Sequence, residues 1–199
     1  MQKIAITGNL ASGKSFVCRA LSLKLRCPLF SSDAFVASIL QQKDVQNLIT
    51  FYLKIEPTKE ALREAVFTQS IKSTNSRKIL ESIVYRRLRL ERKMWTQKHS
   101  KYKILLYEVP LLFEKKLANQ YNNTICIYSS KDMHCQFIKS RGLKHDFAER
   151  IMQNQIPLVI KVKLANKLFY NSLNPIVFRK RLNLLSKSVC QNRSNTTLF

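Results

Sequence analysis

The residues of this chain with the most specific chemistry lie near its start, in the octapeptide Gly8-Asn9-Leu10-Ala11-Ser12-Gly13-Lys14-Ser15. Its two glycines let the backbone turn tightly and bring N–H groups onto phosphate oxygens at the start of a helix. An apolar, strand-like run at residues 4–7 precedes the octapeptide and a helical pattern follows it, which is the context this motif requires. The pattern therefore predicts a loop that binds a nucleoside triphosphate.

Two side chains at the end of the octapeptide have distinct expected roles. Lys14 is expected to reach the β- and γ-phosphates, and the Ser15 hydroxyl to ligate Mg²⁺. The alternatives are an ordinary strand–turn–helix without a ligand and, for Ser15, a plain first-turn position. We expect the triphosphate to contact the octapeptide and the residue after it: Gly8, Asn9, Leu10, Ala11, Ser12, Gly13, Lys14, Ser15 and Phe16.

The chain is strongly basic, with 35 Lys and Arg against 12 Asp and Glu among 199 residues. Such a charge gives an electropositive surface that captures polyanions quickly. It does not identify the polyanion, because phosphorylated metabolites, nucleic acid and a coding bias toward lysine all fit.

The cysteine pattern favours a reducing compartment. Five cysteines are scattered without a C-x-x-C pair, which is typical of free thiols in the cytoplasm, and Cys18 and Cys126 lie in apolar runs of core type. The three histidines lack metal-ligand spacing. We expect no membrane span, because no apolar run approaches the ~18–20 residues that a span needs. We also expect no cleavable leader, since the first residues already form a strand.

Strand-like and helix-like patterns alternate along the chain. Together with the loop after the first strand, this alternation predicts an α/β fold with a parallel sheet flanked by helices. Expected strands cover residues 2–7, 28–32, 103–113, 124–128 and 168–170. Expected helices cover 14–26, a segment from 33, 44–56, a segment from 57, 77–99, 131–141, 146–155, a segment from Pro157, and 175–190, with a frayed tail from 191.

A phosphate loop alone fits ATPases, GTPases and kinases. The guanine-reading motif N-K-x-D is absent from the sequence, which disfavours a GTP switch. The short chain favours a kinase that acts on a small molecule.

Several ordered motifs then narrow the family. Along residues 2–171 the chain resembles dephospho-CoA kinase, the last enzyme of coenzyme A biosynthesis. The resemblance is carried by Gly8–Ser15, Ser31-Ser32-Asp33, Leu62–Phe67, Glu108-Val109-Pro110-Leu111-Leu112-Phe113-Glu114, Gln155-Ile156-Pro157, Lys161, Ala165 and Asn171. The segment 108–114 is the most specific, because it is close to the family's D-x-P-L-L-F-E.

The resemblance implies ATP-dependent phosphorylation of the ribose 3′-hydroxyl of dephospho-CoA, which gives coenzyme A and ADP. It implies a P-loop NTPase-like sheet with a helical substrate-binding insertion and a helical lid. In this chain the core would cover about 1–56 and 101–190, the substrate subdomain about 57–100, and the lid about 137–155.

The resemblance also suggests roles for two carboxylates. Asp33 would accept or orient the proton of the acceptor hydroxyl, although an Asp there could also cap a helix. Glu108, at a strand end, would hold Mg²⁺ waters or substrate; the alternative is a solvated charge. Pro110 and Leu111 would shape the acceptor pocket.

Two arginines and a basic run complete the candidate site. Arg141 would clamp the transferring phosphate from the lid, and Arg63 would contact the acceptor's phosphates; solvated helix residues are the alternatives in both cases. The run at residues 86–103 predicts an amphipathic helix with a wet basic face, or else a strip for an anionic substrate or RNA.

Four positions depart from the family's pattern. Ser31 stands for an acidic residue, Tyr85-Arg86 for a His-Pro element, Phe137 for a lid arginine, and Asn166 for an Asp. The departures suggest divergence and reduced turnover.

Two other functions remain open. One is a P-loop kinase that acts on a nucleoside monophosphate or another small alcohol. The other, less favoured because no nucleic-acid module is visible, is a basic nucleic-acid-binding protein with a vestigial loop. We expect a monomer or a weak homo-oligomer.

Overall fold

The computed structural model describes residues 1–58, 60–62, 71–140, 142, 145–191 and 197–198. These residues form two compact units. The first comprises Met1–Ser31 and His99–Phe199, and the second comprises Ser32–Lys98.

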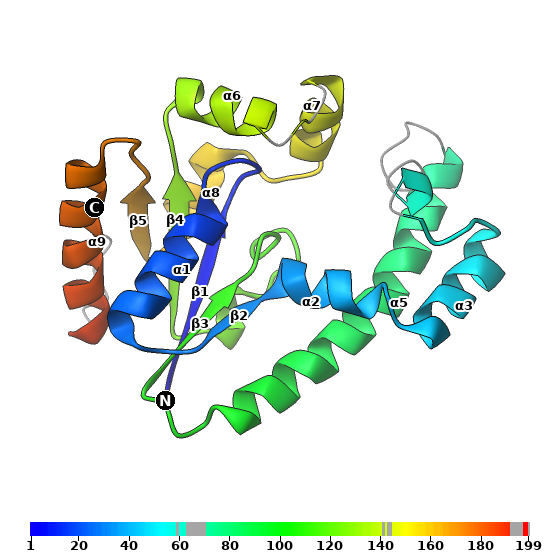
Figure 1. The fold of residues 1–199 in the computed structure, drawn as a ribbon, viewed down its shortest axis with the longest axis horizontal. Helices are drawn as coiled ribbons and strands as arrows, with labels where there is room; N and C mark the ends of the chain where they lie inside the picture. The colour runs from blue at the N-terminus through cyan, green and yellow to red at the C-terminus, as the bar shows by residue number, and fades with distance from the viewer. Residues whose placement is uncertain (59, 63–70, 141, 143–144, 192–196, 199) are drawn as a thin grey trace. The chain divides into compact units, whose positions relative to one another are not determined.

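A parallel sheet forms the centre of the first unit. In the described part of the chain its strand order is β2-β3-β1-β4-β5-β6, and every neighbouring pair is parallel (Figure 1). The sequence prediction of a parallel α/β sheet is confirmed. The strands are β1 (Gln2–Gly8), β2 (Leu29–Ser31), β3 (Ile104–Glu108), β4 (Asn123–Tyr128), β5 (Lys167–Tyr170) and β6 (Thr197–Leu198).

The helices follow the sequence pattern closely. A 3₁₀ turn, η1 (Ala118–Gln120), precedes β4. The α-helices are α1 (Lys14–Leu25), α2 (Ser32–Ile39), α3 (Lys43–Leu53), α5 (Ile71–Lys98), α6 (Lys131–Ser140), α7 (His145–Gln153), α8 (Leu158–Leu164) and α9 (Pro175–Cys190).

Local chemistry fixes several helix ends. Pro157 directly precedes α8, and Gly142 lies between α6 and α7 with a φ of 61° that glycine tolerates best. The side chain of Asn174 accepts hydrogen bonds from the N–H groups of Ile176 and Val177, so it caps α9. Each of these breaks falls where the sequence predicted one.

Both faces of the sheet are covered. The larger core lies on the face of α1 and α9, which run side by side in Figure 1, and includes Ile6, Val17, Ile127 and Leu185. On the other face, α8 packs over Cys126 and Leu168. Cys18 is buried with the larger core, so both cysteines expected in the core are there. None of the five cysteines, all of which are described, forms a disulfide.

The second unit is helical and has its own apolar core. Ile39 of α2, Val45 and Ile49 of α3, and Leu62 are buried together, with apolar residues of α5 packed against them. Because α2 and α3 bury their apolar faces on α5, this unit begins at Ser32, whereas the sequence placed the start of the helical insertion near residue 57.

The C-terminal tail also differs from the expectation. Thr197–Leu198 pair with Lys167 and Leu168 as β6, so β5 is not the last strand and this part of the tail is not frayed. The exposed N–H and C=O groups of an edge strand offer such pairing to any nearby segment.

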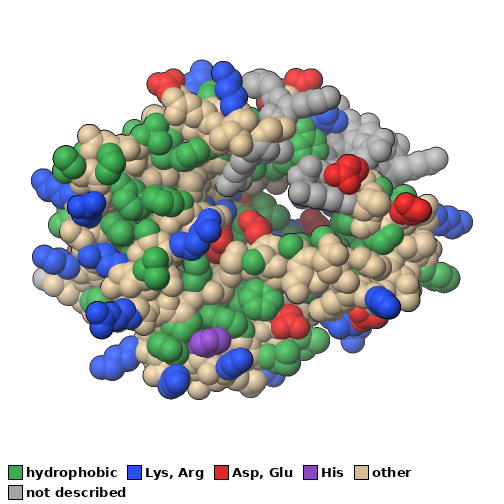
Figure 2. Space-filling view, in the orientation of Figure 1, with side chains coloured by type: hydrophobic (Ala, Val, Ile, Leu, Met, Phe, Trp, Pro, Cys, Tyr) green, Lys and Arg blue, Asp and Glu red, His purple; other side chains and the backbone are tan. Residues whose placement is uncertain are grey.

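Basic side chains are spread widely over the face drawn in Figure 2, where acidic ones are fewer. The predicted basic helix is present as the second half of α5, but Leu90 and Met94 are 53% and 57% exposed and do not form a dry side. No helix in the described ranges is both long and apolar enough to cross a membrane.

Candidate active site

The phosphate loop leaves the carboxyl edge of the sheet at the end of β1 and runs directly into α1. Gly8 lies against β4, where a Cβ would come 2.5 Å from the carbonyl oxygen of Ile127. Gly13 has a φ of 77°, and a Cβ there would collide with the side-chain amide of Asn171. Both glycines are therefore required by the close approach of neighbouring strands and loops.

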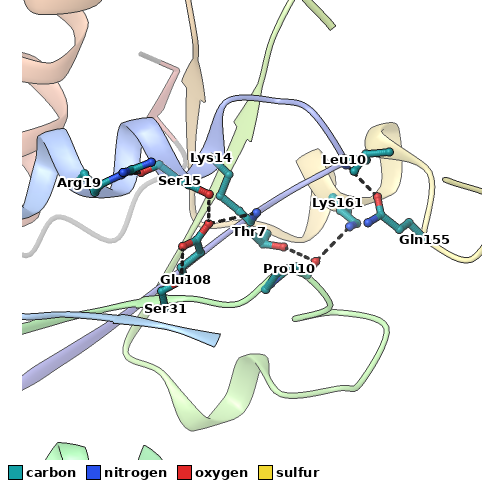
Figure 3. A network of polar contacts seen from close by, with 10 residues as sticks. All are labelled: Thr7, Leu10, Lys14, Ser15, Arg19, Ser31, Glu108, Pro110, Gln155 and Lys161. Atoms are coloured by element: carbon teal, nitrogen blue, oxygen red, sulfur yellow. Dashed lines mark hydrogen bonds and ion pairs between the residues drawn. The ribbon is translucent and has the colours of Figure 1, made fainter. Parts of the chain in front are cut away.

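Two amides distant in sequence brace the loop. Asn171, just after β5, donates from Nδ2 to the carbonyl oxygen of Ser12 at 3.1 Å. Gln155 accepts a hydrogen bond from the N–H of Leu10 at 3.1 Å (Figure 3). The loop backbone is thus held by two side chains from other segments.

The N-terminus of α1 is tied to the end of β3 through Glu108 (Figure 3). Its Oε1 accepts a hydrogen bond from the hydroxyl of Ser15 at 2.6 Å and lies 3.3 Å from Nζ of Lys14. Its Oε2 accepts from the hydroxyl of Ser31 at 2.8 Å, and Ser31 pairs with Glu108 in the register of β2 and β3. Glu108 is only 2% exposed, so it is a networked buried carboxylate and not a solvated charge.

The pKa of Glu108 reflects two opposed effects. Burial raises it, but the charge of Lys14 and the hydrogen bonds from Ser15, Ser31 and Lys14 together lower it below its ordinary value. The carboxylate is therefore ionised at neutral pH and accepts the hydrogen bond from Ser15, which leaves the oxygen lone pairs of Ser15 available for a cation.

A second buried network holds the segment after β3 in place. Lys161 of α8 is fully buried, with Nζ 2.7 Å from Glu114 and 3.5 Å from the carbonyl oxygen of Pro110. That oxygen also accepts from the hydroxyl of Thr7 at 3.1 Å, and Glu114 accepts from the N–H of Ile156. Pro110 is thus fixed between β1 and α8.

The start of the expected lid packs on the loop through apolar contacts. Ile138 and Ala148 are buried with Ala11, and Phe137 and Leu10 pack against them. A Cβ on Gly13 would lie 3.2 Å from the ring of Phe137. The phenylalanine that stands for a lid arginine therefore covers the outer side of the phosphate loop.

The predicted site residues divide into three groups. Lys14, Ser15 and Glu108 come together. Phe16 is 59% exposed and stacks on Phe178 with ring centroids 5.1 Å apart. Asp33 lies in the first turn of α2, two residues beyond Ser31, but belongs to the helical unit. Arg63 and Arg141 lie outside the described residues, so their roles stay predictions.

Two departures from the family's pattern have a local explanation. Asn166 accepts from both the N–H and the hydroxyl of Thr124, each at 2.8 Å, as an aspartate oxygen would. Ser31 hydrogen-bonds Glu108, whereas a carboxylate there would place a second negative charge against it.

The bracing roles of Gln155, Lys161 and Asn171 were not assigned from the sequence. Their spacing carries no local signal, since each acts on a segment more than 40 residues away. The only indication was that they match the family's terminal pattern.

The residues of the loop fit a triphosphate. Within the described part of the chain, Oδ1 of Asn9 and Oγ of Ser12 are buried without a hydrogen-bond partner. Buried polar atoms without partners are rare and costly, and a bound phosphate oxygen would accept a hydrogen bond from the Ser12 hydroxyl. The described residues hold no cluster of His, Cys, Asp and Glu that could bind a metal by itself, so Ser15 would share Mg²⁺ with the nucleotide.

The family model for dephospho-CoA kinase matches residues 2–175. The chain belongs to the dephospho-CoA kinase family. Among its relatives is the dephospho-CoA kinase of Rickettsia prowazekii, 25% identical over 191 residues that cover 95% of this chain and 98% of that protein. The dephospho-CoA kinase of Desulfotalea psychrophila is 28% identical over 182 residues that cover 85% of this chain and 88% of that protein. The family makes this chain a phosphotransferase that uses ATP.

Solved structures show the same fold. The dephospho-CoA kinase from Campylobacter jejuni superposes with a TM-score of 0.66 at 21% identity and covers 95% of this chain and 97% of its own. Shikimate kinase from Bacteroides thetaiotaomicron superposes with a TM-score of 0.53 at 15% identity, and the match covers 94% of this chain and 98% of that protein. The P-loop kinase fold predicted from the sequence is confirmed.

Proposed function

We propose that this protein transfers the γ-phosphoryl group of ATP to the ribose 3′-hydroxyl of dephospho-CoA, giving coenzyme A and ADP. The observation that carries the proposal is the junction of Lys14, Ser15 and buried Glu108 beneath the phosphate loop, in a chain whose family is dephospho-CoA kinase. This junction places a cation, a metal-binding hydroxyl and an ionised carboxylate at the N-terminus of α1, where phosphates bind.

Each residue of the junction has a defined task. The N–H groups of residues 8–15 bind the phosphates, and Lys14 balances the charge of the β- and γ-phosphates. Ser15 donates its hydroxyl hydrogen to Glu108, and its oxygen would be available to hold Mg²⁺. When bound, Mg²⁺ neutralises charge that develops on the phosphate oxygens.

Asp33 is the proposed base. Phosphoryl transfer needs mainly positioning and charge neutralisation, and one carboxylate near the attacking hydroxyl suffices to take its proton. Covalent continuity supports this role, because Asp33 follows Ser31, whose hydroxyl contacts Glu108 at the strand edge. Pro110 and Leu111 would shape the acceptor pocket, Arg63 would bind acceptor phosphates, and Arg141 would clamp the transferring group.

The test is a coupled assay of purified protein with dephospho-CoA and ATP, followed by detection of coenzyme A. We expect Asp33→Asn to lower kcat by about 10²–10⁴-fold, because the general base is lost, while ATP affinity stays within a factor of about two. Asp132→Asn, at an exposed position of α6, is the matched control and should keep full activity.

Two results would contradict the proposal. A near-normal rate of Asp33→Asn would rule out Asp33 as the base. A panel of acceptors with labelled ATP tests the substrate. Transfer of the labelled phosphoryl group to a nucleoside monophosphate or another alcohol, but not to dephospho-CoA, would show that the acceptor is a different compound. The cytoplasmic location of the protein stays a prediction from the cysteine pattern.

A further inference from the structure

A turn within the phosphate loop has an unusual residue at its third position. The N–H of Ser12 donates to the carbonyl oxygen of Asn9 at 3.3 Å, which closes the turn. Its third residue, Ala11, has a φ of 57°. Turns with a positive φ at that position normally have glycine there, because a Cβ crowds the backbone in this conformation. Contacts from outside the turn must therefore hold Ala11 in place.

Helices α6 and α7 supply such contacts. Both lie over the loop end of β1 in Figure 1. Ala11 is only 3% exposed and is buried together with Ile138 of α6 and Ala148 of α7. Phe137 and Leu10 pack against the same cluster. The strained residue of the loop is thus enclosed by apolar side chains from helices far along the chain.

Phe137 extends this contact to the end of the loop. A Cβ on Gly13, the N-cap of α1, would lie 3.2 Å from its ring. Phe137 is half-buried, whereas Gln136 and Lys139 of the same helix are exposed. Its ring is the largest side chain in the contact between α6 and the loop, so it is the side chain whose removal would loosen the contact most.

We propose that Phe137 is a positioning residue that holds the phosphate loop in its binding conformation before ATP arrives. It acts through Ala11 and Gly13, because its ring has no hydrogen-bond donor for phosphate oxygens. A loop that already has the right shape loses less conformational freedom on binding, so ATP binds more tightly. The inference rests on the proposed function only through ATP binding at this loop, and not through the acceptor.

Titrations with two ligands test this role in Phe137→Ala. One ligand is ATP and the other is inorganic triphosphate, which has no nucleoside; the second is measured by displacement of ATP, so that only binding at the loop is counted. We expect Kd for ATP to rise at least about fivefold, the lower end of the usual coupling between linked sites. Kd for triphosphate should rise by the same factor. A rise for ATP alone would place Phe137 against the nucleoside and overturn the proposal.

Three further variants serve as comparisons. Gln136→Ala, at an exposed position beside Phe137, is the matched control and should bind ATP like the wild type. Phe137→Leu keeps an apolar side chain in the contact and should restore the affinity to within about twofold. Phe137→Gln keeps the length of the side chain but not its apolar surface, and should bind ATP as weakly as Phe137→Ala. Circular dichroism checks that each variant folds.

A double-mutant cycle with Ala11→Gly tests the route of the effect. Glycine adopts a positive φ without help, so the turn no longer needs support from α6. In the Ala11→Gly background we therefore expect Phe137→Ala to change Kd for ATP by less than about twofold. An equal loss in both backgrounds would show that Phe137 does not act through the strained turn.

Steady-state kinetics separate positioning from a general loss of structure. In Phe137→Ala, KM for ATP should rise with Kd, while kcat at saturating ATP changes less than about twofold. Partial unfolding would instead lower kcat and leave KM unchanged, and this result would overturn the proposal.

Hydrogen exchange of the ligand-free protein tests the inference independently of the proposed function. The N–H groups of Leu10 and Ser12 are hydrogen-bonded within the folded loop. We expect both to exchange at least about fivefold faster in Phe137→Ala than in the wild type or Gln136→Ala, because the support of the loop is lost. Faster exchange would uphold the positioning role even if dephospho-CoA were not the acceptor. Unchanged exchange would overturn it even if dephospho-CoA were phosphorylated.

Discussion

At the scale of single residues, Glu108 is the side chain that connects the candidate site. It joins the end of β3 to Lys14 and Ser15 at the start of α1, and Ser31 donates a hydrogen bond to its second oxygen. The sequence placed it at a strand end but could not decide between a solvated charge and a site residue. At 2% exposure Glu108 is not a solvated charge, and its part in the reaction stays a prediction.

Glu108→Gln tests this network through its pH dependence. The pKa of Glu108 is lowered from 4.5, so the folded state binds the proton less readily than the unfolded state. The advantage of the wild type over Glu108→Gln is therefore fully present above pH 4.5 and is lost as the pH falls through the lower, folded pKa. We expect a difference of about 2 kcal/mol at pH 7 in the free energy of unfolding, the size of one hydrogen bond to a charged group.

Urea denaturation between pH 3 and pH 7 measures this difference. Glu60→Gln, at an exposed position, serves as the control and should show little pH-dependent difference. A gap that stays constant across this range, or that grows toward low pH, would show that the Glu108 charge does not stabilise the fold.

At the scale of elements, the phosphate loop depends on segments far along the chain. Asn171, just after β5, and Gln155, just before α8, hold the backbone of the loop through hydrogen bonds. Helices α6 and α7 pack apolar side chains against the loop. The parallel sheet explains this arrangement, because the carboxyl ends of β1, β4 and β5 lie along one edge.

Asn171→Ala should weaken nucleotide binding without altering the chemistry. It removes the donor to the carbonyl oxygen of Ser12 and the side chain packed against Gly13. We expect Kd for ATP to rise about tenfold, which corresponds to roughly 1.4 kcal/mol for one buried hydrogen bond. Calorimetric titration with ATP measures the change.

The matched control is Asn183→Ala on the exposed side of α9, where only the backbone oxygen of residue 183 accepts a hydrogen bond. Equal ATP affinity of both variants would mean that the loop keeps its shape without Asn171.

At the scale of the whole molecule, the main feature is the excess of positive charge. A formal charge of +23 on 199 residues opposes compaction through self-repulsion. We expect Tm to rise when NaCl is increased from about 0.05 to 0.5 M, because the screening length falls from about 14 to about 4 Å. Scanning calorimetry measures the shift, and KCl should reproduce it. A Tm that falls with either salt would show that ion pairs outweigh repulsion.

Much of the fold was predictable because its signals are local. Glycine, proline and capping residues such as Gly142, Pro157 and Asn174 restrict the backbone within a few residues, so the end of α6 and the starts of α8 and α9 were placed well. The pairing of Thr197–Leu198 with β5 was missed, because a two-residue strand carries no periodicity and its partner lies about 30 residues away.

The sequence by itself determined the phosphate loop, the parallel α/β class and the family, because each depends on residue types at fixed short spacings. Only the tertiary structure decided which distant groups support the loop: Glu108, Gln155 and Asn171 reach it from three other segments. Such contacts depend on how strands are ordered and helices packed, and spacing along the chain does not encode those distances.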